Sequence, residues 1–359
     1  MDVTQKVDPK TQNPEAQNAL VEAALNETNE ANEAQETPAQ NTSEGSTISG
    51  LSIDQNWDAD SAVGTERESS TESLRSSIYA YVEENGRRYH KYKEGKYYFP
   101  NDEEEQDRLD LQHHLFLLTL DGKLALAPIE EMPGGIHNVL DIGTGTGIWA
   151  IDFATNFPSA DVIGTDLSPI QPAFVPPNCR FEVDDAEDEW TFSQKFDYIH
   201  GRMLGSCFIS HVKVFESAFQ FLRPGGWLEM QDFGFPFRCV DDTMKGTAFE
   251  RWLELVQVGC RKLGKDLGLA PSYHQYMRDI GFVDIQQKFV AWPIGSWPKD
   301  EKMKILGAWC KENILSGMQG NSIAILTRGL GMTSDEVEML LAEARQDINS
   351  KKLHCYTPM

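Results

Sequence analysis

The sequence predicts an α/β fold with a doubly wound, Rossmann-like and mostly parallel sheet, carrying helical additions on its N- and C-terminal sides. Short apolar runs rich in β-branched residues alternate with helical patterns between about residues 138 and 232, and the connections between them are short. Several of these runs end in an acidic residue or a histidine. Because the carboxyl ends of parallel strands meet at one edge of a sheet, we expect a ligand site at that edge.

The chain of 359 residues divides by composition into an acidic leader and a folded remainder. Residues 1–70 hold 14 acidic and three basic residues, with Trp57 as their only aromatic. Such a segment cannot bury enough apolar surface to offset its ordering entropy. The segments that we expect are a disordered acidic tail (1–75), an N-terminal helical cap (76–130) and a main domain (131–359) that includes helical lid-like additions (241–281 and 299–349).

Charge and cysteine usage exclude several classes of protein. Of the formal net charge of −24, residues 1–70 contribute −11 and the remainder −13, which argues against broad affinity for nucleic acid or anionic membranes. Six cysteines are scattered without C-x-x-C pairs, so neither a disulfide framework nor a metal site is supported. The chain lacks a secretory signal and any run of about 18 apolar residues. We therefore expect a cytoplasmic and/or nuclear protein that is not secreted and does not span a membrane.

One local basic run lies near the start of the predicted folded region. We interpret it as solvated surface in preference to a nuclear signal or a phosphate site. Its members are Arg87, Arg88, His90, Lys91 and Lys93.

The stretch Val139–Gly147 predicts a buried strand that enters a glycine-rich turn and then a helix. Its glycine spacing is G-x-G-x-G, which differs from the G-x-G-x-x-G of dinucleotide binders, and an acid precedes the first glycine. Glycines let backbone approach a ligand, and a helix start presents free N–H groups. This pattern points to S-adenosylmethionine. The predicted contacts in the turn are Asp141, Gly143, Thr144, Gly145 and Gly147.

Two further acids follow the next two predicted strands. Asp166 ends the strand at 161–166, where a carboxylate can accept hydrogen bonds from both ribose hydroxyls, with Leu167 beside it. Asp185 follows the strand at 180–183 and can accept from the adenine amino group, while the N–H of Ala186 can reach a ring nitrogen. A solvated loop is the alternative interpretation of the acidic run around Asp185. Its place in a series of strands that end in acids favours the cofactor site.

The core resembles the class I S-adenosylmethionine-dependent methyltransferases, and residues from about 98 to 359 are similar to the fungal LaeA-like (UMTA-type) family. So many linked motifs make the resemblance specific. The matching stretches are Phe99–Glu105, Arg108–Asp110, Leu126–Ile129, Val139–Trp149, Val162–Pro172, Val175–Asn178 and Leu222–Glu229.

The resemblance implies a seven-stranded sheet whose last two strands form an antiparallel hairpin. It also implies cofactor contacts at Asp141, Gly143, Gly145, Asp166 and Asp185, and a role in secondary metabolism. Members of the family usually continue beyond the final helix into a longer strand than the residues Lys352–Met359 provide. We therefore expect the outer strand of the hairpin to be shortened.

Methyl transfer from a sulfonium needs alignment of donor and acceptor more than it needs a covalent nucleophile or a metal. A base helps when the acceptor carries a proton. His200, at the end of the strand 196–200, is the leading candidate, followed by His113 and by Asp232 at the end of the fifth strand. Each histidine can instead be a packed structural residue. Arg202 can pair with the carboxylate of the cofactor or form a surface ion pair.

Three functions are compatible with these patterns. The first is an enzyme that methylates a small, flat metabolite in an aromatic pocket formed by Tyr97, Tyr98, Trp252, Tyr273 and Trp292. The second is a nuclear regulator with velvet-type protein partners and little turnover, which the resemblance to the LaeA branch implies. The third, an NAD-dependent oxidoreductase, is disfavoured by the glycine spacing.

Overall fold

The computed structural model describes residues 80–359. The predicted disordered tail of residues 1–75 lies outside the described residues, and so do the first residues of the predicted N-terminal cap. Among the described residues, no helix combines the length and the apolar composition needed to cross a bilayer.

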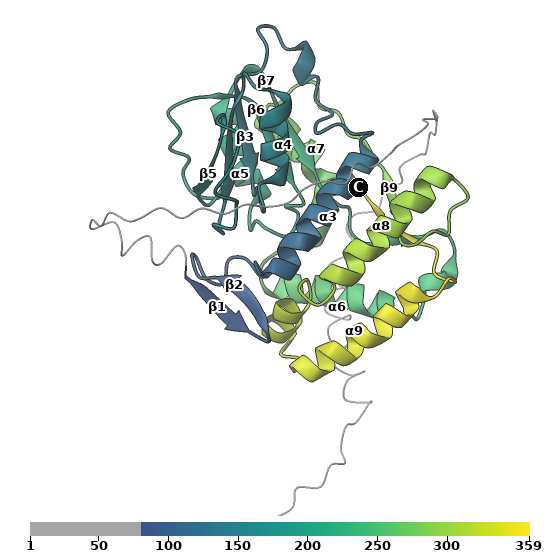
Figure 1. The fold of residues 1–359 in the computed structure, drawn as a ribbon. Helices are drawn as coiled ribbons and strands as arrows, with labels where there is room; N and C mark the ends of the chain where they lie inside the picture. Colours follow the sequence, from purple (N-terminus) through teal and green to yellow (C-terminus); the bar gives the residue numbers. More distant parts are fainter. Residues whose placement is uncertain (1–79) are drawn as a thin grey trace, which may run out of the picture. The chain divides into compact units, whose positions relative to one another are not determined.

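A five-stranded parallel sheet forms the centre of the fold (Figure 1). Its strands are β3 (Asn138–Ile142), β4 (Asp161–Asp166), β5 (Cys179–Val183), β6 (Phe196–Arg202) and β7 (Leu222–Gln231). Their order in the sheet is β5-β4-β3-β6-β7, with every neighbouring pair parallel. The chain moves outward in opposite directions from β3, and ligands bind at such a switch point in doubly wound sheets. The predicted fold class is confirmed.

Helices cover the two faces of this sheet because neighbouring residues of a strand point to opposite sides. Val139 packs with Trp149 and Phe153 of α4 (Ile148–Asn156) on one face. Leu140 packs with Val214 of α5 (His211–Phe221) on the other. A strand buried on both faces carries apolar residues on both of them, as Val139, Leu140 and Ile142 of β3 do.

The two remaining strands of the expected seven do not extend the parallel sheet. Among the described residues, a separate three-stranded antiparallel sheet has the order β8-β10-β9. Its strands are β8 (Arg238–Cys239), β9 (Ala291–Pro293) and β10 (Cys355–Pro358). The stretch before β9 does not extend this strand toward its N-terminus, because Val283 and Phe289 are largely exposed and give it no buried face.

The C-terminal segment differs from the shortened outer strand that we expected. β10 is the central strand of the small sheet, and the backbones of Met359 and Val290 exchange two hydrogen bonds just beyond it. The backbone N–H of Gly234 also donates to the carbonyl of Pro358, at 2.7 Å. This segment is therefore held on both sides next to the end of β7.

The segment before the parallel sheet is not entirely helical. It begins with a hairpin of β1 (Tyr81–Glu84) and β2 (Arg87–His90) and continues into α3 (Glu103–Thr119). Asp102 caps α3 by accepting from the N–H of Glu105, and it also receives two hydrogen bonds of 2.7 Å from the buried guanidinium of Arg87. Part of the predicted solvated basic run is therefore structural.

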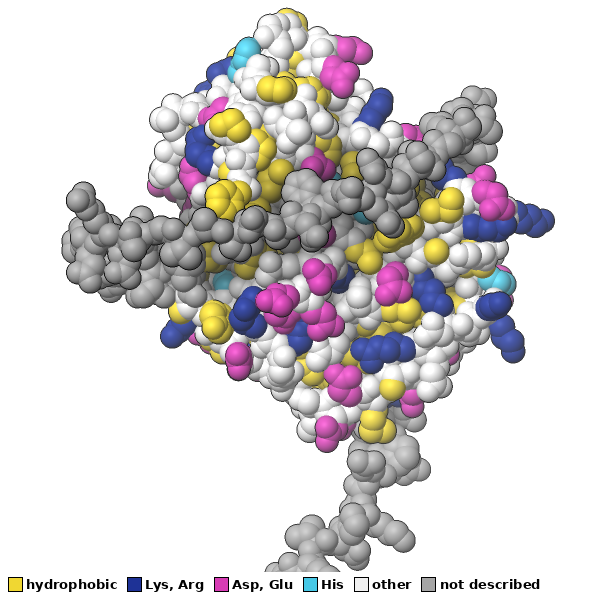
Figure 2. Space-filling model, viewed as in Figure 1, with side chains coloured by type: hydrophobic (Ala, Val, Ile, Leu, Met, Phe, Trp, Pro, Cys, Tyr) yellow, Lys and Arg dark blue, Asp and Glu magenta, His cyan; other side chains and the backbone are white. Residues whose placement is uncertain are grey.

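The C-terminal part contributes a second helical layer (Figure 1). This layer contains α6 (Ala248–Lys262), α8 (Glu301–Gly317) and α9 (Ser334–Asn349), whereas α7 (Tyr273–Ile280) lies beside the parallel sheet (Figure 1). α8 packs against α3, α6 against α9, and α7 against α5. On the face shown in Figure 2, basic side chains are interspersed with acidic ones instead of gathering into one basic surface.

Candidate cofactor and acceptor site

A cavity of about 250 Å³ opens at the carboxyl ends of the central strands and extends toward the helical layer. Ten of the thirteen predicted site residues line it: Asp141, Gly143, Thr144, Gly145, Asp166, Leu167, Asp185, Ala186, His200 and Arg202. Gly147, His113 and Asp232 lie outside its lining. Most of the residues that we assigned to one ligand site therefore converge on one space.

The glycine turn requires glycine for conformation and for space. Gly143, Gly145 and Gly147 all have positive φ, at 62°, 60° and 83°. A Cβ on Gly143 would lie 2.5 Å from Cδ2 of Leu204, and one on Gly147 would lie 2.3 Å from Cζ of Phe181. Gly147 thus permits the backbone conformation at the start of α4, although it does not line the cavity. Its contact with a ligand stays a prediction.

Asp141 and His200 form a buried pair beneath the turn. They are direct neighbours in the β3–β6 ladder, and Oδ1 of Asp141 lies 2.7 Å from Nδ1 of His200. The other carboxylate oxygen accepts from the hydroxyl of Thr144 at 2.6 Å. The imidazole is fully buried and stacks on Trp149, with ring centroids 3.8 Å apart and planes 5° apart. This packing indicates that His200 orients Asp141. The role of His200 as a base stays a prediction.

Asp166 is fixed at the tip of β4 by two backbone donors. The N–H of Gly145 donates to Oδ2 at 2.9 Å and that of Ser168 to Oδ1 at 2.8 Å. Burial raises the pKa of this carboxyl to about 6, and these hydrogen bonds offset only part of the increase. Each carboxylate oxygen has two lone pairs, so Asp166 retains capacity to accept from two ribose hydroxyls.

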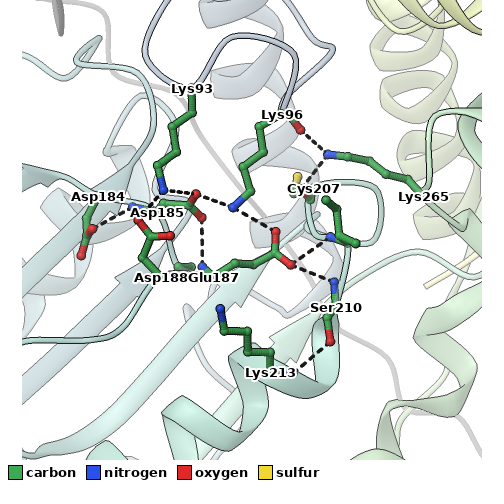
Figure 3. Close-up of polar contacts among 12 residues, drawn as sticks. Lys93, Lys96, Asp184, Asp185, Glu187, Asp188, Cys207, Ser210, Lys213 and Lys265 are labelled. Carbon is green, nitrogen blue, oxygen red and sulfur yellow. Dashed lines mark hydrogen bonds and ion pairs between the residues drawn. The ribbon is translucent and has the colours of Figure 1, made fainter.

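Asp185 lies at the tip of β5 with only 2% of its surface exposed. Oδ1 accepts from the N–H of Glu187 at 3.0 Å, and Oδ2 accepts from the ammonium groups of Lys93 and Lys96. The two lysines belong to the segment between β2 and α3 (Figure 3). Nothing in the sequence assigns them to this site, because they are about ninety residues away from it along the chain.

Arg202 ends β6 at the cavity wall. Its guanidinium lies 4.9 Å from the ring centroid of Phe116, and Nη1 lies 3.1 Å from Nδ1 of His113. Burial lowers the pKa of Arg202 to about 10. Within residues 80–359 it makes no ion pair with a carboxylate, so it remains available to a ligand anion.

The other two candidate bases are engaged in structural contacts. His113 connects Arg202 to Asp152, whose Oδ2 lies 3.0 Å from Nε2 of the histidine. Oδ2 of Asp232 accepts from the hydroxyl of Tyr273 at 3.0 Å and from the N–H of Leu204 at 3.1 Å. Burial raises the pKa of Asp232 to about 7. A catalytic role for either residue requires movement that exposes it to the cavity.

Apolar and aromatic side chains make up most of the rest of the cavity lining, beside the charged pair of Glu105 and Arg108. Tyr97, Trp252 and Trp292 line the cavity as predicted, whereas Tyr98 and Tyr273 do not. Several further wall residues were not predicted from the sequence, and they come from the stretch after β7 and from the C-terminal segment. These are Phe233, Phe235, Phe237, Thr357 and Met359.

The residues present fit S-adenosylmethionine at the end of the cavity that the turn forms. The N–H of Ala186 has no partner among the described residues, which leaves it free for a ring nitrogen. Asp166 and Asp185 each keep acceptor capacity for hydroxyl and amino hydrogens. Arg202 supplies a cation for a carboxylate. These groups occupy the tips of three strands and complement the two polar ends of the cofactor.

Comparison with known proteins defines the class. A family model described as a methyltransferase domain matches residues 111–287, a range that contains every predicted cofactor contact. Together with the Rossmann-like sheet, this match identifies an S-adenosylmethionine-dependent methyltransferase.

Curated relatives narrow the class to a fungal family. Methyltransferase pytC of Aspergillus terreus is 38% identical over 295 residues, covering 82% of this chain and 90% of the relative. The secondary metabolism regulator laeA of Monascus pilosus is 33% identical over 314 residues, covering 83% of each chain. The probable methyltransferase tdiE of Emericella nidulans is 34% identical, covering 71% of this chain and 80% of the relative. This chain belongs to the LaeA-like family of fungal methyltransferases.

Solved structures resemble this chain only distantly. A phosphoethanolamine N-methyltransferase of Haemonchus contortus, in complex with phosphomonomethylethanolamine and S-adenosylhomocysteine, has a TM-score of 0.39 and 16% identity. The match covers 80% of this chain and 72% of that one.

Proposed function

We propose that this chain methylates a small, largely apolar metabolite of fungal secondary metabolism in the cytoplasm or nucleus. The observation that carries the proposal is the aromatic wall of the cavity, formed by Phe233, Phe235, Trp252 and Trp292. Aromatic faces favour flat, apolar ligands. Glu105 and Arg108 in the lining are paired with each other, so they offer no uncompensated charge to an acceptor.

The proposed division of labour follows from the contacts in the cavity. S-adenosylmethionine supplies an activated methyl group when it is bound. Asp166 and Asp185 hold its ribose and adenine, Arg202 binds its carboxylate, and the aromatic wall orients the acceptor and excludes water. Rate enhancement by such alignment needs no covalent nucleophile. His200, which lines the cavity, or Asp232 after movement toward it would add base catalysis.

Calorimetry tests the cofactor half of this proposal. We expect S-adenosylmethionine and S-adenosylhomocysteine to bind and NAD to give no heat of binding. Gly145→Arg should abolish binding, since a long side chain would enter the cavity from a position with φ of 60°. Asp166→Ala should weaken it by removing the ribose acceptor. Unchanged affinity in both variants would refute the assigned site.

A second candidate function is regulation of secondary metabolism with velvet-type protein partners and little turnover. It is favoured by the relatives that are named as regulators, at 33% identity. Metabolite profiling separates the two functions when a deletion strain is compared with a strain that carries Gly145→Arg. Loss of a single methylated product supports the enzyme, whereas silencing of many pathways supports the regulator.

A further inference from the structure

The segment between β2 and α3, residues 91–100, forms one wall of the cavity at the end where Asp185 lies. Lys96, Tyr97 and Phe99 of this segment line the cavity. Its backbone includes a residue held in the left-handed region, Lys93 at φ 50°. That conformation is unfavourable for a lysine, so contacts elsewhere must maintain it. We refer to residues 91–100 as the strap.

Two lysines attach the strap to the acidic loop after β5 (Figure 3). Lys93 pairs with Asp185 at 2.7 Å and also contacts Asp188. Lys96 pairs with the same oxygen of Asp185 and lies 3.2 Å from Oε2 of Glu187. Because Asp185 is buried and both lysines are mostly covered, these pairs are less screened by solvent than a surface ion pair.

The lysines leave Asp185 able to bind a ligand. Burial alone would raise the pKa of its carboxyl, but hydrogen bonds from Lys93 and Lys96 outweigh burial and lower that pKa. The group therefore stays an acceptor near neutral pH. Three donors occupy its two oxygens, and a carboxylate offers about four lone-pair positions, so one position remains on Oδ1.

A third lysine holds the strap from the opposite side. Lys265, just beyond α6, is only 4% exposed, and its ammonium donates to the carbonyls of Lys96 at 2.6 Å and Cys207 at 2.7 Å. It also lies 5.1 Å from the ring centroid of Tyr98. A buried ammonium with carbonyl partners on two segments ties the strap to the loop after β6. The strap is thus fixed at both of its edges.

We propose that Lys93 and Lys96 are positioning residues for the cofactor: they hold the strap over its adenine end and orient Asp185 toward the adenine amino group. This inference rests on the proposed cofactor site. Cofactor release then requires the strap to open. The cofactor site then includes the strap, which precedes the region matched by the methyltransferase domain family.

The test measures binding and dissociation of S-adenosylhomocysteine for the full chain and for Lys93→Met/Lys96→Met. We expect the double variant to bind about tenfold more weakly, mainly through faster dissociation, because it loses two charge-assisted contacts. The matched control is Lys91→Met, since Lys91 is exposed and its side chain makes no polar contact among the described residues. Its affinity should stay within about twofold of wild type.

Two readouts separate positioning from a general loss of structure. The double variant should weaken the binding of adenosine by the same factor as that of S-adenosylhomocysteine, because the strap acts on the adenosine part that both compounds share. Added salt should speed dissociation in the wild type more than in the double variant, since the lysine pairs are screened. Lys93→Arg/Lys96→Arg should restore most of the affinity by restoring the charges.

The outcomes also distinguish this inference from the proposed function. Failure of the wild-type chain to bind either compound would refute both. Binding by the wild type with unchanged affinity in the double variant would overturn only the strap inference. Tighter binding by the double variant would also overturn it, because the lysines would then be competitors of adenine. Faster amide exchange over residues 91–100 in the ligand-free double variant is expected in addition, and unchanged exchange would contradict the inference.

Discussion

Gly147→Ala should be the most damaging of the conservative changes in the glycine turn. The substituted residue would have to adopt φ of 83° at the cap of α4, which costs roughly 1–2 kcal/mol for a residue with a Cβ. The new methyl would also lie 2.3 Å and 2.8 Å from two ring atoms of Phe181. That ring has little room to retreat, because it already fills the space that a Cβ on Gly164 would need and so packs directly on the backbone of β4.

Overpacking of this kind costs about 1–3 kcal/mol, so the expected total loss of unfolding free energy is about 2–5 kcal/mol. Gly225→Ala is a matched control, because Gly225 has the same φ of 83° and no atom lies within 4 Å of the point that its Cβ would occupy. It should lose only the conformational part, about 1–2 kcal/mol. Urea denaturation of both variants measures the difference.

The double variant Gly147→Ala/Phe181→Leu sharpens this test. Leucine is smaller than the ring, so the glycine substitution should cost less in that background than in the wild type. Equal destabilisation by Gly147→Ala and Gly225→Ala, or an unchanged cost in the leucine background, would refute the idea that the ring of Phe181 restricts this position.

Three other predictions concern different parts of the fold. Affinity for S-adenosylhomocysteine should fall roughly tenfold per pH unit below about 6, as Asp166 takes up a proton, and Asp166→Asn should flatten the profile measured by calorimetry. The free energy of unfolding of the ligand-free chain depends on pH in the opposite sense. Because burial raises the pKa of Asp166, its contribution to stability is present at low pH and is lost as pH rises through about 6. Glu105→Gln should destabilise the chain by about 3–5 kcal/mol in urea, because it removes the negative charge that compensates the buried guanidinium of Arg108 at 2.7 Å, whereas Glu104→Gln, at an exposed side chain, should change little. Thr333→Ala should cost about 1 kcal/mol by removing the capping box of α9, which a lower thermal midpoint would reveal and an unchanged one would contradict.

The cofactor half of the cavity could be predicted from the sequence because each of its features is local. Val139–Gly147 carries both an apolar run and its terminating glycines, and Asp166 directly follows the next run. In a parallel sheet the ends of neighbouring strands are necessarily adjacent. The local patterns therefore predict that residues distant along the chain lie together at the carboxyl-terminal edge of the sheet.

The remaining wall depends on contacts that local patterns do not report. Lys93 and Lys96 lie in a turn with no periodicity, and their partner Asp185 lies about ninety residues later. β8, β9 and β10 have two, three and four residues, too few for an alternating pattern to show. His200 is well placed along the chain to be a base, but its stacking on Trp149 depends on how α4 packs on the sheet.

The position of β10 between β8 and β9 suggests an order for folding. The pairs of the parallel sheet join strands that are mostly consecutive along the chain, whereas Cys355 pairs with Cys239 across 116 residues. Closing a long loop costs more entropy and slows the formation of such contacts. The glycine-turn half of the cavity is therefore expected to assemble early, and the wall that contains Thr357 and Met359 to assemble late. Under mild denaturant, amides of β10 should exchange before those of β3. The wall that contains Thr357 and Met359 would then be lost while the glycine-turn half of the cavity stays folded.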